Sequence, residues 1–333
     1  IAGQSNVGSI DAGVNLAQEL VLTLREGIFP DYPALKAAYF ARLRETVRTV
    51  VGQANEEMLA MRGRPQYIRT LLCPHCAEAG KEYNAGGAAY YFSVINVCAL
   101  ANAADSLYAV KKLVYEEKRF SYGRMMSAIS SDFAHDEEYL RAARSLVCFG
   151  NDDPEADSVA EEIFSFVCGE LEGYRTAIGE GRFLPACIMF DTVLSTGRMT
   201  DATPDGRKKG APVSDSGGAM TGRDRVSPTA LCNSLSRIFP QRAVGTWVVN
   251  VMLGSGMIRG ENAHRALRAL ILGYFAKGGN QLQFTIADRE ILLAAVDDDE
   301  LARGILVRVG GFSERFSNLS RDFRRNIAER TGY

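Results

Sequence analysis

The residues best placed for unusual chemistry lie near the C-terminal end, where an apolar run precedes two adjacent glycines. Residues 305–309 read ILVRV, and Gly310, Gly311 and Phe312 follow. This run predicts a buried strand that ends at the double glycine. One interpretation is an ordinary turn between a strand and a helix, because glycine adopts positive φ without steric cost. The other is a glycine that carries out chemistry a side chain would prevent.

The segment that surrounds these glycines resembles the C-terminal signature of the glycyl radical enzymes, the superfamily of pyruvate formate-lyase and the diol dehydratases. The family pattern is Arg-Val-x-Gly-Tyr, with a Phe four residues after the aromatic position and an Arg-Thr pair near the end. Phe312 replaces the usual Tyr. The positions that match the pattern are Arg308, Val309, Gly311, Phe316, Arg330 and Thr331.

The resemblance implies that Gly311 is the catalytic residue and stores an unpaired electron on its backbone α-carbon. An amide nitrogen that donates electron density and a carbonyl that withdraws it flank this carbon, and delocalisation over both requires a planar centre. A side chain would oppose planarity, so only glycine fits. We expect Gly311 to be buried at the tip of a loop inside the fold. Substitution of the preceding Gly310 by Ala should at most perturb the loop, because this position varies in the family pattern.

Further short segments, here called blocks, also resemble segments of the family, and they follow one another in the same order as in the family. Together they span most of residues 83–333. The blocks SDSGG and SPTA favour the dehydratase and carbon–heteroatom lyase branch over strict pyruvate formate-lyase. Each block alone is a commonplace turn or helix, whereas their order together with the C-terminal signature is specific. The blocks span residues 83–118, 149–153, 202–218, 222–224, 227–238 and 278–288.

The family's catalytic Cys, which usually lies in a Gly-Cys-x-Glu loop, has no counterpart in this sequence. Cys73 and Cys76 form a single CxxC pair, which is a weak signal for metal or redox chemistry, and we interpret both as structural thiols. The other cysteines lie in apolar or helical contexts typical of core packing. They are Cys98, Cys148, Cys168, Cys187 and Cys232.

Residues 3–27 resemble the segment that follows the family's Cys loop. The catalytic Cys and Glu would then lie a few residues before Ile1, in a longer enzyme of which this chain is the C-terminal part. Ser9 and Ile10 fall where family members place residues that contact substrate. Ile10 stands where glycerol-type dehydratases carry a polar residue. The alternative is that both simply lead into a helix.

Composition excludes several other classes of function. The 333 residues are 47% hydrophobic and 23% charged with a formal net charge of −2, which is typical of a globular chain and not of a general nucleic-acid binder. No apolar run is long enough for a membrane span. Three scattered His residues make a three-His metal site improbable. Seven Cys favour reduced thiols in a cytoplasmic compartment.

Periodicity predicts helices first and strands later, which favours an α/β fold. Asp11 is predicted to cap a helix that ends at Gly27, and Pro33 begins a long helix. Further helices are predicted over 98–117, 155–178 and 321–330. A long ordered loop is expected over 181–225, and the predicted strands cover 246–253, 281–287 and 305–309.

The resemblance implies the second half of a glycyl radical enzyme barrel, with many surrounding helices and a C-terminal Gly loop inserted in the barrel. We expect residues 1–209 to belong to the barrel domain and 210–333 to form the glycyl radical domain. The implied partners are a radical S-adenosylmethionine iron–sulfur activase, a small polar substrate and a second copy in a homodimer, with no cofactor bound. The alternatives are a stand-alone accessory radical subunit and a degenerate relative without catalysis.

Overall fold

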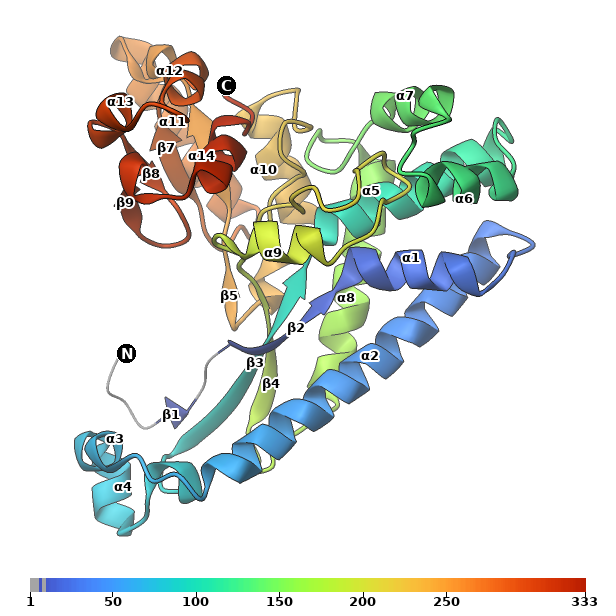
Figure 1. Cartoon of the computed structure of the whole chain (residues 1–333). Helices are drawn as coiled ribbons and strands as arrows, with labels where there is room; N and C mark the ends of the chain where they lie inside the picture. The colour runs from blue at the N-terminus through green and yellow to red at the C-terminus, as the bar shows by residue number, and fades with distance from the viewer. Residues whose placement is uncertain (1–5, 8–9) are drawn as a thin grey trace.

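The computed structural model describes residues 6–7 and 10–333, which form an α/β molecule with parallel strands and many helices (Figure 1). The strands are β1 Asn6–Val7, β2 Ile10–Asn15, β3 Tyr90–Cys98, β4 Arg182–Cys187, β5 Thr246–Trp247, β6 Asn250–Leu253, β7 Gln283–Ile286, β8 Leu306–Arg308 and β9 Ser313–Arg315. The helices are α1 Leu16–Glu26, α2 Tyr32–Met61, α3 Tyr67–Leu72, α4 Pro74–Ala79, α5 Leu100–Val110, α6 Tyr122–Ser130, α7 Glu137–Ser145, α8 Pro154–Glu172, α9 Thr192–Arg198, α10 Pro228–Arg237, α11 Glu261–Ala276, α12 Arg289–Ala294, α13 Asp299–Arg303 and α14 Arg321–Ala328.

The main sheet consists of parallel strands in the order β2, β3, β4, β5, with β1 beside the start of β3. Asn96 of β3 is in register with Gly13 of β2 and with Ala186 of β4, and Ala186 is in register with Thr246 of β5. Beyond this sheet, β6 and β7 form a second parallel pair, and β8 and β9 form an antiparallel hairpin. This hairpin carries the double glycine.

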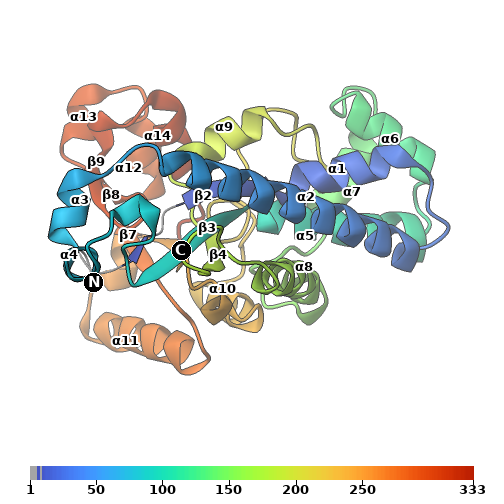
Figure 2. The ribbon, with the colours of Figure 1, turned by 90° about the horizontal axis from the view of Figure 1, so that it is seen from below.

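Helices cover one face of the main sheet, and α2 runs along it beside α1 (Figures 1 and 2). The side chain of Asp31 caps α2 by accepting a hydrogen bond from the backbone N–H of Ala34 at 2.8 Å, and Pro33 lies in the first turn. The predicted apolar stripe of this helix is confirmed as buried: Leu35, Tyr39, Leu43, Val47 and Val50.

The N-terminal helix begins later than predicted. Asp11 lies within β2, and Asn15 is the residue that caps α1, its side chain accepting from the N–H of Gln18 at 3.2 Å. The helix ends before Gly27, as expected. The prediction failed because the short strand before the helix continues directly into it without a turn residue.

Sequence periodicity also missed β3 and β4, and it merged β5 and β6 into one strand over 246–253. In β3, the residues from Ser93 to Cys98 are all buried. A parallel strand covered on both sides has no alternation of polar and apolar residues, so its pattern resembles that of a buried helix. The predicted loop over 181–225 contains β4 and α9 and is irregular only beyond them.

The helix α5, which lies within the helix predicted over 98–117, is buried along its whole length. Its Asp105 is 4% exposed and accepts a hydrogen bond from the backbone N–H of Phe149 at 2.8 Å through Oδ1, whereas Oδ2 has no hydrogen-bond partner. Burial raises the pKa of the Asp105 carboxyl to about 7, partly offset by the positive charge of Arg223.

This carboxyl predicts a measurable pH dependence of stability. Between pH of about 4 and 7 the folded state retains a proton that the unfolded state has released, so the free energy of unfolding falls as pH rises through this window. Asp105→Asn removes the titrating carboxyl. The fall in the free energy of unfolding across this window should therefore be about 1–3 kcal/mol smaller in the variant than in wild type. Urea unfolding from pH 4 to 8 measures it, with Asp322→Asn on the exposed start of α14 as control. Equal pH slopes for wild type and Asp105→Asn would contradict the prediction.

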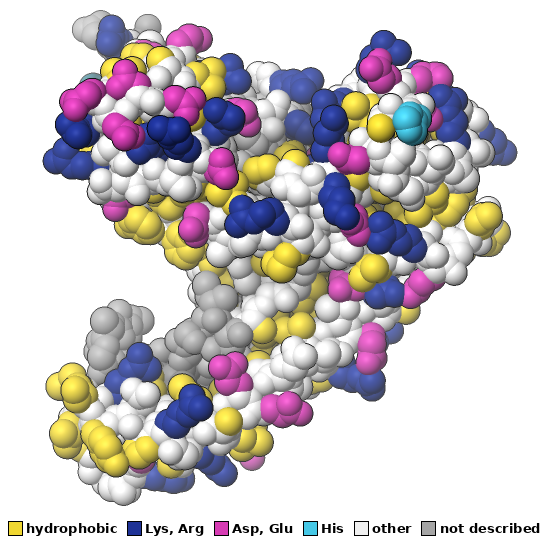
Figure 3. Space-filling model, in the orientation of Figure 1, with side chains coloured by type: hydrophobic (Ala, Val, Ile, Leu, Met, Phe, Trp, Pro, Cys, Tyr) yellow, Lys and Arg dark blue, Asp and Glu magenta, His cyan; other side chains and the backbone are white. Residues whose placement is uncertain are grey.

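The molecule is deeply hollowed on the side seen in Figure 3. The hollow lies between the lobe that carries α11 to α14 and the arm that carries α3 and α4 (Figures 1 and 3). One apolar cluster joins the carboxyl ends of the sheet strands to the C-terminal lobe, and a second lies on the main sheet itself. Half-buried Phe190, which follows β4, packs against both. Phe190 therefore links the carboxyl end of a sheet strand to the lobe that holds the double glycine.

Candidate functional site

The double glycine forms the turn of the β8–β9 hairpin. Arg308 pairs with Ser313 at the end of the ladder, and the N–H of Val309 donates to the carbonyl of Phe312 at 3.0 Å. Gly310 and Gly311 are the two residues between them. Gly311 has φ of +95°, a region that favours glycine, and it occupies the third position of the turn, where type II turns place glycine. The local fold therefore favours glycine at Gly311 independently of any chemistry.

A single side-chain amide holds this turn from the neighbouring strand β7. The Oε1 atom of Gln283 accepts a hydrogen bond from the N–H of Gly311 at 2.9 Å, and its Nε2 atom donates to the carbonyl of Val309 at 3.3 Å. The strand β7 also supports β8 directly, because the hydroxyl of Thr285 accepts from the N–H of Arg308 at 3.0 Å. Gln283 thus bridges Gly310 and fixes the peptide units on both sides of it.

Further polar groups continue from Gln283 into the core. Gln283 Nε2 also donates to Oδ1 of Asn250, and Asn250 Nδ2 donates to the carboxylate of Asp215 at 2.8 Å. Arg330 donates to the same Asp215 oxygen at 2.6 Å and to the carbonyl of Arg308 at 3.4 Å. A buried ion pair between the loop after α9 and the segment after α14 therefore supports both the amide network and strand β8.

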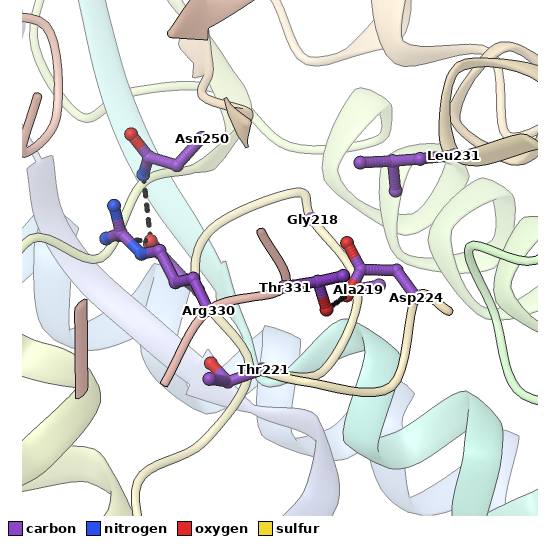
Figure 4. A pocket seen from close by; sticks show the side chains of 9 residues that line it. Gly218, Ala219, Thr221, Asp224, Leu231, Asn250, Arg330 and Thr331 are labelled. Atoms are coloured by element: carbon purple, nitrogen blue, oxygen red, sulfur yellow. Dashed lines mark hydrogen bonds and ion pairs between the residues drawn. The ribbon is translucent and has the colours of Figure 1, made fainter. Parts of the chain in front are cut away.

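A small cavity lies beside this ion pair, as Figure 4 shows. Asn250 and Arg330 converge on one side of it, and Thr331 pairs with Asp224 on the other. Its volume of about 30 Å³ is sufficient for one water molecule and too small for a substrate. The cavity is therefore not a substrate pocket.

The expectation that Gly311 is buried is wrong for this chain. Gly311 is exposed and Gly310 is buried. A Cβ atom on Gly311 would meet nothing within 4 Å, whereas one on Gly310 would lie 2.4 Å from Cδ1 of Phe190. Phe190 also lies 6.1 Å from Phe312, measured between ring centroids. Gly310 has less room for a side chain than the family pattern suggests, because the ring of Phe190 occupies the space where its Cβ would lie.

None of the cysteines has the surroundings of a reactive thiol. All seven are buried. Burial raises the pKa of Cys98, of Cys168 and of Cys232 to about 12, so their nucleophilic thiolate form is rare at neutral pH. Cys73 and Cys76 pack in an apolar cluster with Tyr91, which agrees with the structural interpretation.

Of the two residues suggested for substrate contact, the structure describes one, Ile10. Ser9 lies outside the described residues. Ile10 is the first residue of β2 and is in register with Val94 of β3, which places its backbone in the main sheet. Gly311, in contrast, lies in the C-terminal lobe, and whether these residues share a pocket with it stays a prediction.

The described part of the chain contains neither a candidate metal centre nor a membrane-spanning helix. No group of three or more His, Cys, Asp or Glu side chains in residues 6–7 and 10–333 is arranged to hold a metal ion. Across the same residues, no helix combines the length and the apolar character needed to span a membrane.

Sequence reasoning missed Gln283, Asn250 and Asp215 as parts of the site. A sequence signal for Gln283 did exist, because polar and apolar residues alternate over the predicted strand 281–287, but this alternation does not identify the partner of Gln283. Arg330 was noted only as a match to the family pattern. The structure brings these four residues together with Gly311.

Comparisons with known proteins assign the family. A family model described as pyruvate formate lyase-like matches residues 12–192, and one described as glycine radical matches residues 213–317, a range that includes the β8–β9 hairpin. The first of these covers more than half of the chain. The chain therefore belongs to the glycyl radical enzyme family.

Curated relatives and solved structures agree with this assignment. Trans-4-hydroxy-L-proline dehydratase of Clostridioides difficile is 28% identical over 91% of this chain and 38% of its own length. (2S)-3-sulfopropanediol dehydratase of Klebsiella oxytoca is 32% identical over 77% of this chain and 32% of its own. The glycerol-bound B12-independent glycerol dehydratase from Clostridium butyricum superposes with a TM-score of 0.91 at 30% identity, covering 96% of this chain and 43% of that one.

These comparisons confirm the predicted fold class. The chain has the α/β architecture of the second half of a glycyl radical enzyme barrel, and it spans about two fifths of the length of the solved relative. Its relatives are dehydratases and lyases.

Proposed function

We propose that this chain is the radical-bearing C-terminal part of a glycyl radical dehydratase or carbon–heteroatom or carbon–carbon lyase that acts on a small polar metabolite. Gly311 carries the radical. The observation that carries this proposal is the β8–β9 turn. In it, a glycine with φ of +95° and no contact at its Cβ position is held by Gln283 at its N–H.

The geometry at Gly311 suits hydrogen-atom removal from its α-carbon. No atom occupies the space where a Cβ would lie, and the residue is exposed, so an activating protein can reach it. The resulting radical delocalises over the flanking nitrogen and carbonyl. A radical S-adenosylmethionine iron–sulfur activase removes the hydrogen atom, and the chain itself binds no cofactor.

The second radical site lies outside this chain. The Gly311 radical takes the hydrogen atom of a Cys thiol, and the resulting thiyl radical takes a hydrogen atom from the substrate. The substrate radical loses water or another leaving group, and the product radical takes a hydrogen atom back from the thiol, which regenerates the thiyl radical. The sequence carries no Gly-Cys-x-Glu loop, which supports a donor Cys elsewhere. Ser9 and Ile10 contribute to the substrate pocket, in keeping with the position of Ile10 at the start of a barrel strand.

The reaction class follows the relatives. Their names describe dehydration of hydroxyproline and of sulfopropanediol, and sulfite release from isethionate. All are small polar compounds that lose a group from a carbon next to the carbon that can bear a radical. We extend this substrate class to the present protein, in a cytoplasmic enzyme that forms homodimers.

The arm of this molecule carries an exposed apolar patch on α3. Four large apolar residues of α3 are exposed, which is unusual on a free surface. They are Tyr67, Ile68, Leu71 and Leu72, with exposed fractions of 70–78%.

We assign residues 1–209 to the barrel domain and residues 210–333 to the glycyl radical domain; the matched family ranges end at 192 and begin at 213.

The decisive experiment compares two forms after anaerobic activation. The chain alone is expected to give no turnover, and a form extended upstream through a Gly-Cys-x-Glu loop is expected to give turnover with a doublet radical signal. Turnover by the chain alone would contradict the external thiol. If the activated chain carries the radical but turns over substrate only together with a separate Cys-bearing protein, the chain is an accessory subunit. No radical in the extended form under full activation would indicate a degenerate relative.

A further inference from the structure

We propose that the Asp215–Arg330 ion pair orients a relay of two side-chain amides, Asn250 and Gln283, so that the relay ends in a hydrogen-bond acceptor at the N–H of Gly311. In this relay Gln283 is a positioning residue for the radical glycine. Its influence on the radical rests on the proposed function, whereas its hold on the turn does not.

The direction of the relay follows from the donors and acceptors at its ends. Asp215 carries a carboxylate that is paired with Arg330 and can only accept, so Asn250 must present its Nδ2 donor to it. The Oδ1 acceptor of Asn250 then faces Gln283, so Gln283 must donate to it through Nε2. The Oε1 acceptor of Gln283 is left facing Gly311. A flipped amide at either position would place two donors or two acceptors together.

The backbone of the turn agrees with the same orientation. Gln283 Nε2 meets the carbonyl of Val309, an acceptor, and Gln283 Oε1 meets the N–H of Gly311, a donor. Gln283 is 5% exposed, Asp215 is 8% exposed and Arg330 is 6% exposed, so water competes little for these groups. The buried Asp215–Arg330 pair thus fixes the orientation of the Gln283 amide through the side chain of Asn250.

This orientation has a consequence for the chemistry at Gly311. An N–H that donates a hydrogen bond leaves more electron density on its nitrogen, and that nitrogen donates density to the half-filled orbital of the α-carbon. Accepting at Gln283 Oε1 therefore stabilises the Gly311 radical and holds its amide in the plane that delocalisation requires. The opposite amide orientation would place a donor against the Gly311 N–H and release the turn.

The first test uses this chain without activation. Gly311 is exposed, so its amide exchange depends mainly on the bond to Gln283 and not on burial. Gln283→Leu is expected to accelerate exchange of the Gly311 amide with deuterium about tenfold, and Asn250→Ala about threefold. Asn250→Ala leaves the Asp215–Arg330 pair intact, so it disrupts the relay without stranding a charge.

The matched control is Gln281→Leu. Gln281 lies just before the same strand, and its Oε1 accepts from the N–H of Val249 at 2.8 Å, so this variant loses one amide–backbone bond without touching Gly311. Gly311 exchange should be unchanged in it. Equal exchange in Gln283→Leu and wild type, no change in Asn250→Ala, or equal acceleration by Gln281→Leu would overturn the proposal.

The second test uses the activated, upstream-extended protein. Gln283→Leu should change the hyperfine splitting of the radical spectrum and shorten its anaerobic lifetime severalfold, whereas Gln281→Leu should change neither. An unaltered spectrum and lifetime in Gln283→Leu would overturn the electronic role of the relay. Absence of a radical in wild type would refute the proposed function instead, and the exchange measurements would still decide whether the relay holds the turn.

Discussion

Replacing Gly311 with Ala is expected to abolish both the radical signal and the oxygen-dependent cleavage of the activated, upstream-extended protein. The methyl group opposes the planar α-carbon that delocalisation needs. It also strains the turn, because φ at Gly311 is +95°, and Ala at positive φ costs about 1 kcal/mol. A Cβ would meet no atom within 4 Å, so the variant should fold. Loss of the radical would then be a chemical effect and not the result of unfolding.

Oxygen provides an independent assay of the radical position. In air, addition of O2 to the Gly311 α-carbon should cleave the chain there and release a C-terminal peptide that begins at or next to Gly311. Electron paramagnetic resonance before air exposure and mass spectrometry of the fragments afterwards measure both effects. A radical signal that survives Gly311→Ala, or cleavage at another residue, would show that Gly311 is the wrong residue.

Gly304→Ala is the matched control for this variant. Gly304 lies just before the same hairpin, with φ of −82°, and its Cβ would meet nothing closer than the carbonyl oxygen of Leu301 at 3.9 Å. It should retain the wild-type radical yield and cleavage pattern. A loss of signal in Gly304→Ala as large as in Gly311→Ala would indicate general damage to the hairpin.

Replacing Gly310 with Ala is expected to destabilise the chain by about 1–3 kcal/mol, although this position varies in the family pattern. Its Cβ would lie 2.4 Å from Cδ1 and 2.5 Å from Cε1 of Phe190, far inside van der Waals contact. Phe190 packs against two apolar clusters, so a displaced ring loses contacts with both. A displaced turn instead weakens the Gln283 bonds that bridge Gly310, and either response destabilises the chain.

A double-mutant cycle isolates the clash. In a Phe190→Ala background the ring is gone, so Gly310→Ala should cost at least 1 kcal/mol less than in wild type. Urea unfolding of the four proteins gives the coupling energy. Equal costs of Gly310→Ala in both backgrounds would show that the contact with Phe190 is not the cause.

The sequence alone determined those features that depend on neighbours in the chain. Asp31 and Pro33 begin α2, and the three-to-four-residue spacing of its apolar side chains determines its buried face. The apolar run before Gly310 and Gly311 likewise specifies a strand that ends in a turn, as β8 does. The order of short blocks with the C-terminal signature was sufficient to identify the family.

Tertiary structure decided which of the two glycines has room and what holds them. Gln283 lies 28 residues from Gly311, and the Asp215–Arg330 pair joins residues 115 apart. Local propensity carries no information about such pairs, because they form only when separate strands and loops dock. The strand β3 was missed for a related reason: burial on both faces removes the alternation that would reveal it. The signature therefore predicts the turn from local residues, while its orientation and its support depend on contacts that only the folded chain creates.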